Sequence, residues 1–181
     1  MRQIVLVNGV PASGKSTVAA HLIPQLSIAG RCPLPLHLDI VKEALFAQIG
    51  TGDRDYNRML GRASYQAIFD SINAFPDTVL PIIDAWHGFQ PREILQMYLT
   101  RARIEQVVEV WVSVSPQTAA ARYRARAETR HTGHLPQSYA DELFILAERA
   151  QPMGFGPVIS VDGEVPLPTD ITGRIVDAFK T

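Results

Sequence analysis

The stretch from Gly9 to Thr17, GVPASGKST, has the residue types and spacing of a phosphate-binding loop. In the pattern of glycine, four residues, then Gly-Lys-Ser, small residues let backbone amides approach phosphate oxygens closely. Lys15 would bring a mobile positive charge to the β- and γ-phosphates, and the Ser16 hydroxyl would be a ligand for Mg²⁺. We therefore expect contacts to a nucleoside triphosphate from Gly9, Ala12, Ser13, Gly14, Lys15, Ser16 and Thr17.

The residues on either side of this loop favour the same interpretation. The short β-branched run Ile4 to Val7 predicts a buried strand before the loop. After Lys15, apolar residues recur at helical spacing, and a helix starting here would add its N-terminal amides and dipole to a phosphate site. The alternative is a glycine-rich turn with a chance Lys-Ser pair.

Two carboxylates follow predicted strands elsewhere in the chain. Asp39 follows the strand expected over residues 34–38, where it could accept the proton of a hydroxyl that attacks the γ-phosphorus. Asp39 could instead cap a helix beginning near Val41. Asp84 follows the strand expected over residues 79–83. It could orient Mg²⁺ through water or hold the acceptor, because ligands bind at the carboxyl edge of parallel strands; the alternative is another helix or turn cap.

Two further groups of side chains could serve the acceptor and the nucleotide. Trp86 and His87 could line the acceptor pocket, or be a structural tryptophan and a surface histidine. The arginine-rich run over residues 121–134 includes arginines that a mobile lid could bring to the transferred phosphate, because their forks stabilise its spread negative charge. We expect that role for Arg126 and Arg130, and adenine stacking for Arg122, against the alternative of a solvated helix face. His131 and His134 fit a lid turn better than a zinc site.

The composition limits the class of protein. A chain of 181 residues that is 46% hydrophobic can form one domain, and strands that alternate with helices predict a parallel sheet covered on both faces. The formal net charge of −1 gives no basic excess for a polyanion. The single cysteine excludes an internal disulfide framework, and no apolar run reaches membrane length. We expect a cytoplasmic protein.

The chain resembles the small P-loop kinases of the AAA_33 group, together with polynucleotide 5′-hydroxyl kinases, zeta toxins, chloramphenicol phosphotransferase and adenylylsulfate kinase. The resemblance rests on GVPASGKST, LDIVKEAL (38–45), IIDAWHGF (82–89) and ARYRARAETRHTGH (121–134), of which only the first is highly specific. It implies a three-layer α/β P-loop NTPase fold with a five-stranded parallel sheet of nucleoside-kinase type. It also implies one domain over residues 1–181, a helical lid at about 116–137, and a loop at Asp162-Gly163 against the adenine.

These observations predict an ATP- and Mg²⁺-dependent phosphotransferase that moves the γ-phosphoryl group to a hydroxyl of a small molecule. The missing basic excess favours a small acceptor over a polymer. Three alternatives stay open: a polynucleotide 5′-hydroxyl acceptor, a sugar nucleotide as for the zeta toxins, and an ATP-binding regulatory module without transferase activity. Guanine-reading motifs are missing from the sequence. The identity of the acceptor and the oligomeric state cannot be predicted from it.

Overall fold

The sheet confirms the predicted fold class. The computed structural model describes residues 1–180 and contains one sheet of five parallel strands in the order β2-β3-β1-β4-β5. These strands are β1 (Gln3–Asn8), β2 (Cys32–His37), β3 (Val79–Asp84), β4 (Gln106–Ser113) and β5 (Val158–Asp162). The middle strand, β1, leads directly into the phosphate-binding loop.

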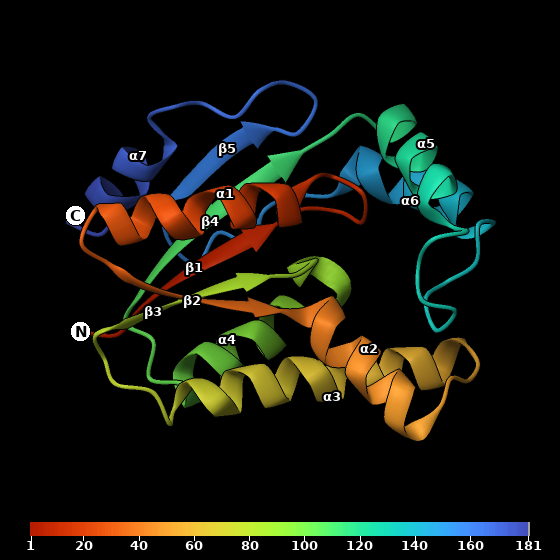
Figure 1. Ribbon diagram of the computed structural model, residues 1–181, viewed down its shortest axis with the longest axis horizontal. Coiled ribbons are helices and arrows are strands. Elements are labelled where there is room, and N and C mark those ends of the chain that lie inside the picture. Colours follow the sequence, from red (N-terminus) through yellow and green to blue (C-terminus); the bar gives the residue numbers. More distant parts are fainter. Residues whose placement is uncertain (181) are drawn as a thin grey trace.

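Helices cover both faces of the sheet, giving three layers (Figure 1). On one face lie α1 (Lys15–Ile28) and α7 (Ile171–Ala178), and on the other lie α3 (Arg54–Ile72) and α4 (Arg92–Arg101). Beyond the carboxyl ends of the strands are α2 (Leu38–Ile49), α5 (Pro116–Arg126) and α6 (Tyr139–Arg149). A short 3₁₀ turn spans His87–Phe89.

Successive residues of β1 explain why the sheet needs a helical layer on each side. Val5 and Val7 belong to the core under α1 and α7, whereas Ile4 and Leu6 belong to the core over α3 and α4. A strand whose side chains are apolar on both faces reads as a continuous hydrophobic run, as IVLV does. Among residues 1–180, no helix has both the length and the apolar character to cross a bilayer.

Prolines lie inside the two strands β2 and β3. Pro33 and Pro35 lie in β2, which is an edge strand, where a missing backbone donor is tolerated. Pro81 lies in β3 between β2 and β1, so the strand expected there forms in spite of its proline. The observed helix α2 begins at Leu38, three residues before the predicted start at Val41.

The strand register brings the carboxyl ends of β1, β2 and β3 together. His37, the last residue of β2, is paired with Asp84, the last residue of β3. Val7 of β1 is paired with the same Asp84 from the other side. The phosphate-binding loop and the first turn of α2 therefore start beside one another at this edge.

Candidate active site

The phosphate-binding loop wraps around the start of α1. Gly14 is the N-cap of that helix and has a φ of 99°, a left-handed conformation that glycine adopts without strain. Ala12 has a φ of 67°, which is strained for a residue with a side chain. Within residues 1–180, the backbone N–H groups of Gly14, Lys15 and Ser16 meet no acceptor. Converging free amides at a helix start suit phosphate oxygens.

A buried hydrogen-bond network holds the beginning of this loop. The Asn8 side-chain oxygen accepts from the backbone N–H of Gly9 at 2.8 Å and of His87 at 3.0 Å. The Asn8 amide donates to Glu109 of β4 at 2.7 Å, and both residues are fully buried. The pairing of Asn8 with Glu109 was not predicted from the sequence. The one feature of the sequence that could have indicated this pair is the isolated carboxylate of Glu109 within the apolar strand QVVEVWVS.

Lys15 carries a positive charge that no carboxylate of the described chain neutralises through an ion pair. Burial lowers its pKa, while the charges of Asp84 and Asp39 favour the protonated form. Arg126 and Arg130 lower the same pKa by repulsion. Anionic phosphates would relieve both the desolvation and the repulsion.

Asp84 and Ser16 form the part of the site that fits Mg²⁺. Asp84 Oδ2 accepts from the His37 ring at 3.1 Å, and Asp84 Oδ1 is buried without a partner among the described residues. Burial alone would raise the pKa of Asp84, but hydrogen bonds from His37 and Ser16 and the charge of Lys15 bring it below its ordinary value. An ionised carboxylate with one unpartnered oxygen next to a serine hydroxyl is a hard-oxygen donor set of the kind Mg²⁺ prefers. Asp84 caps no helix, so that alternative is wrong.

His37 is a second residue that the sequence analysis missed. Its hydrogen bond to Asp84 raises its own pKa. The contact depends on β2 and β3 being neighbours, which residue spacing alone does not indicate.

One cavity of about 410 Å³ joins the phosphate-binding loop to α2, α3 and the α5–α6 segment. The predicted site residues that line it come from four separate segments of the chain: Ala12, Lys15, Ser16, Asp39, Asp84, Trp86, Arg126 and Arg130. A cavity of this size suits a small ligand.

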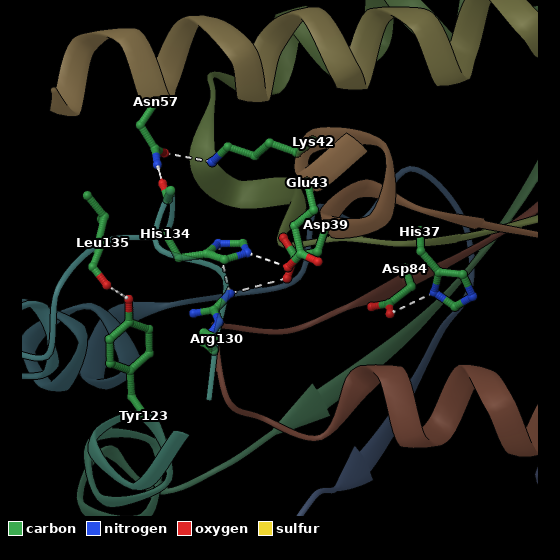
Figure 2. Close-up of polar contacts among 11 residues, drawn as sticks. His37, Asp39, Lys42, Glu43, Asn57, Asp84, Tyr123, Arg130, His134 and Leu135 are labelled. Carbon is green, nitrogen blue, oxygen red and sulfur yellow. Dashed lines mark hydrogen bonds and ion pairs between the residues drawn. The ribbon is translucent and has the colours of Figure 1, made fainter. Parts of the chain in front are cut away.

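Asp39 lies in the first turn of α2, with its side chain 62% exposed. The N-cap of that helix is His37, so the alternative that Asp39 is the cap is wrong. Arg130 donates to Asp39 Oδ2 at 3.3 Å and approaches His134 Nδ1 at 3.1 Å (Figure 2). His134 Nε2 lies 2.6 Å from Glu43. The predicted base and one predicted lid arginine are therefore in direct contact.

The segment between α5 and α6 is tied to α2 and α3 by further contacts. The Asn57 side chain donates to the Gly133 carbonyl and accepts from Lys42 Nζ at 2.6 Å. His131 stacks on Phe46 with ring centroids 5.3 Å apart. His131 and His134 thus lie in this turn, and no group of three or more metal-binding side chains occurs within residues 1–180.

Arg122 and Arg126 face different parts of the site. Arg122 Nη1 donates to the Gly163 carbonyl at 3.0 Å and approaches the Ser13 carbonyl at 3.5 Å. Arg122 therefore links the phosphate-binding loop to the loop after β5, where the adenine was expected. Arg126 lines the cavity, and burial followed by repulsion from Arg130 lowers its pKa.

Of the two predicted acceptor residues Trp86 and His87, only Trp86 lines the cavity. His87 is fully buried and does not line the cavity, so it is neither an acceptor contact here nor a surface histidine. Its Nδ1 lies 2.6 Å from the Tyr65 hydroxyl, and burial lowers its pKa to about 4. The ring packs against Tyr65, and the backbone N–H of His87 is bound by the Asn8 side chain.

Similar folds are found among solved structures. A candidate kinase from Chloroflexus aurantiacus has a TM-score of 0.79 and 23% identity over 98% of this chain and 97% of its own. Shikimate kinase from Bacteroides thetaiotaomicron has a TM-score of 0.57 and 16% identity over 99% of both chains. Chaetomium thermophilum Kti12, solved with ADP-AlF3, has a TM-score of 0.64 and 18% identity over 98% of this chain and 97% of its own. No curated protein sequence gives a significant match.

The similarity to these structures shows that the chain has a P-loop kinase fold. Residues 4–143 match the AAA_33 family, which is described as an AAA domain. This match covers well over half of the chain and includes the phosphate-binding loop, Asp39, Asp84 and the cavity-lining arginines. The protein therefore belongs to the AAA_33 family of nucleotide-binding P-loop proteins.

Proposed function

We propose that this protein transfers the γ-phosphoryl group of ATP to a hydroxyl group of a small-molecule acceptor. The observation that carries the proposal is that Lys15, Ser16, Asp39 and Arg126 line the same cavity. A phosphate-binding lysine, a carboxylate base and a lid arginine facing one space are the parts that phosphoryl transfer requires. Kinase neighbours of the same fold support this function.

Each side chain has a defined task in this mechanism. Lys15 and the loop amides hold the phosphates, and Arg126 neutralises the negative charge that spreads over the transferred group. The acceptor hydroxyl gives its proton to Asp39 while its oxygen bonds to the γ-phosphorus. The bond from the γ-phosphorus to the β–γ bridging oxygen breaks, and ADP leaves with that oxygen. Mg²⁺, held by Ser16 and Asp84, would supply further charge neutralisation on the phosphates.

The segment over residues 116–137 acts as the lid in this proposal. Its Arg130 is engaged with Asp39, so we assign Arg130 to orienting the base and Arg126 to the phosphate. We assign Arg122 to stacking on the adenine, and its hydrogen bonds to the Gly163 and Ser13 carbonyls support this assignment. We place the protein in the cytoplasm, as for a soluble kinase.

The test is ATP consumption with Mg²⁺ against a panel of acceptors. The panel contains sugars, nucleosides, hydroxy acids, hydroxylated antibiotics, adenylylsulfate, sugar nucleotides and a 5′-hydroxyl oligonucleotide. We expect turnover with one small-molecule class, and loss of at least about 100-fold of it in Lys15→Ala and in Asp39→Asn. Lys180→Ala and Asp70→Asn are matched controls, because both residues form exposed ion pairs outside the cavity.

The outcomes separate the alternatives. Turnover only with the oligonucleotide would replace the small acceptor by a polynucleotide 5′ end, and turnover only with the sugar nucleotide would indicate zeta-toxin-like specificity. Tight ATP binding without turnover for the whole panel would favour a regulatory module. Wild-type turnover in Lys15→Ala would refute the assignment of Lys15 to the phosphates of ATP. Asp39→Asn should still bind ATP, because Asp39 lies on α2 and not on the phosphate-binding loop.

A further inference from the structure

The cavity carries more positive charge than the transferred phosphates need. Its lining contains six cationic side chains and two carboxylates. The carboxylates are already engaged, Asp39 with Arg130 and Asp84 with His37. Under the proposed function, the nucleotide phosphates neutralise the charges of Lys15 and Arg126. The cations left over are Lys42, Arg54 and Arg58.

Lys42 is the most deeply placed of these three. It lies three residues after Asp39 on α2, so the two side chains share a face of the helix. Its ammonium donates to the neutral amide oxygen of Asn57, and no carboxylate among residues 1–180 forms an ion pair with it (Figure 2). Burial lowers its pKa, which the charge of Asp39 only partly offsets. A partly buried cation without an anionic partner is costly, and an anionic ligand would remove that cost.

Arg58 is available to the same ligand from α3. Its one ion pair is with Asp55 at 3.3 Å, and the two side chains are 58% and 88% exposed. Such a surface pair holds its arginine weakly. Arg54, one turn earlier, is instead bound by two hydrogen bonds to Glu142 of α6. Arg54 is therefore already paired, and we assign Arg58 to the ligand.

The same cavity is also lined by apolar and aromatic side chains, among them Leu38, Trp86, Phe89 and Tyr139. A ligand that contacts both these side chains and the two cations needs an apolar or flat face as well as a negative group. The volume of about 410 Å³ also includes the space beside Lys15 and Asp84, so the acceptor is small.

We propose that the acceptor is a small hydroxylated acid whose carboxylate or phosphate group binds between Lys42 and Arg58 while its hydroxyl faces Asp39. This inference extends the proposed function to an acceptor class. The negative group gives the lysine and the arginine charged partners. The helical spacing of Asp39 and Lys42 fixes how far the reacting hydroxyl lies from that group.

The test measures binding without turnover, with ADP and Mg²⁺ present. The probes are matched pairs that differ only in charge: hydroxy acids such as shikimate with their amides, and sugar phosphates with their parent sugars. We expect at least one acid to bind, with its neutral partner weaker by about tenfold or more. Lys42→Gln and Arg58→Gln should each weaken the acid by about tenfold or more, leaving the Kd of ADP close to that of the wild type. Lys180→Gln and Arg174→Gln, on the far side of the molecule, are the matched controls.

Three results would overturn the inference. They are no binding by any acid, equal binding by acid and neutral partner, and unchanged acid binding in both Lys42→Gln and Arg58→Gln. Binding only by hydroxy acids or only by sugar phosphates decides between a carboxylate and a phosphate. Because the assay needs no turnover, an acid that binds at these residues but is never phosphorylated would refute the proposed function and retain this site. Phosphorylation of neutral acceptors alone would retain the proposed function and refute the binding of a negative group at Lys42 and Arg58.

Discussion

Replacing Glu109 by glutamine should destabilise the protein far more than the loss of one charge suggests. Glu109 is fully buried in β4. Its Oε1 accepts from the Asn8 amide at 2.7 Å and from Met153 N–H at 2.9 Å, and its Oε2 accepts from Gly154 N–H at 2.8 Å. Every partner is a donor. A glutamine amide must therefore set an NH₂ group against an N–H group at one of the two oxygen positions.

The magnitude follows from these three bonds. A hydrogen bond to a charged acceptor contributes about 1.5–3 kcal/mol, a neutral one about 1 kcal/mol, and an unsatisfied buried donor costs about 1–3 kcal/mol. In the better orientation, the glutamine oxygen keeps the bonds to Asn8 and Met153 in weakened form and loses the bond to Gly154. We expect Glu109→Gln to lower the free energy of unfolding by about 3–5 kcal/mol.

Urea denaturation of Glu109→Gln, with Glu148→Gln as control, measures this effect. Glu148 is exposed on α6, and its substitution should change stability by less than about 0.5 kcal/mol. Because Asn8 also holds Gly9 N–H, the Glu109 variant should bind ADP more weakly even where it stays folded. A loss of stability below about 1 kcal/mol would refute the reasoning, since it would mean that the three donors find other acceptors.

Two further predictions come from close packing and from burial. A Cβ added at Gly163 would lie 2.1 Å from the Ser13 carbonyl oxygen, so Gly163→Ala should lower the free energy of unfolding by about 1–3 kcal/mol and weaken ADP binding. Gly173→Ala, where nothing lies within 4 Å, should instead be neutral or stabilising in the same urea and calorimetric assays, and equal effects of the two would contradict the packing argument. The pKa of His87 is lowered from 6.5 to about 4 by burial, so below pH 6.5 the unfolded chain takes up a proton that the folded chain does not. Stability should be full above that pH and decline by about 3 kcal/mol as the pH falls towards 4, whereas an unchanged pH slope in His87→Gln would show that another group is responsible.

Much of the fold and of the nucleotide end of the site could be predicted from the sequence, because the signals there are local. The motif from Gly9 to Thr17 would bind phosphate through consecutive backbone amides, so nine neighbouring residues are enough to predict it. Alternation of apolar strands with amphipathic helices predicted the parallel sheet, and the strands expected over residues 4–7, 34–38 and 79–83 occur as β1, β2 and β3. Helix starts were less certain, since α2 begins three residues before its predicted start and places Asp39 inside the helix.

Contacts between distant segments were decided only by the tertiary structure. Sequence spacing does not give strand order, so it could not show that His37 meets Asp84 or that Asn8 meets Glu109. From the sequence, His87 and Trp86 were both predicted to line the acceptor pocket. In the structure His87 is buried against Tyr65, and only Trp86 lines the cavity.

The sequence by itself thus predicted a phosphate-binding loop and determined the kind of fold that carries it, because those properties reside in contiguous residues and in periodicity. The tertiary structure decided which charges share one cavity. Lys42 and Arg58 are 16 residues apart on two helices, and both line one cavity with Asp39 and Trp86 because of how α2, α3 and the α5–α6 segment pack at the sheet edge. Burial and long-range packing set the electrostatics of this cavity, and neither can be read from residue order alone.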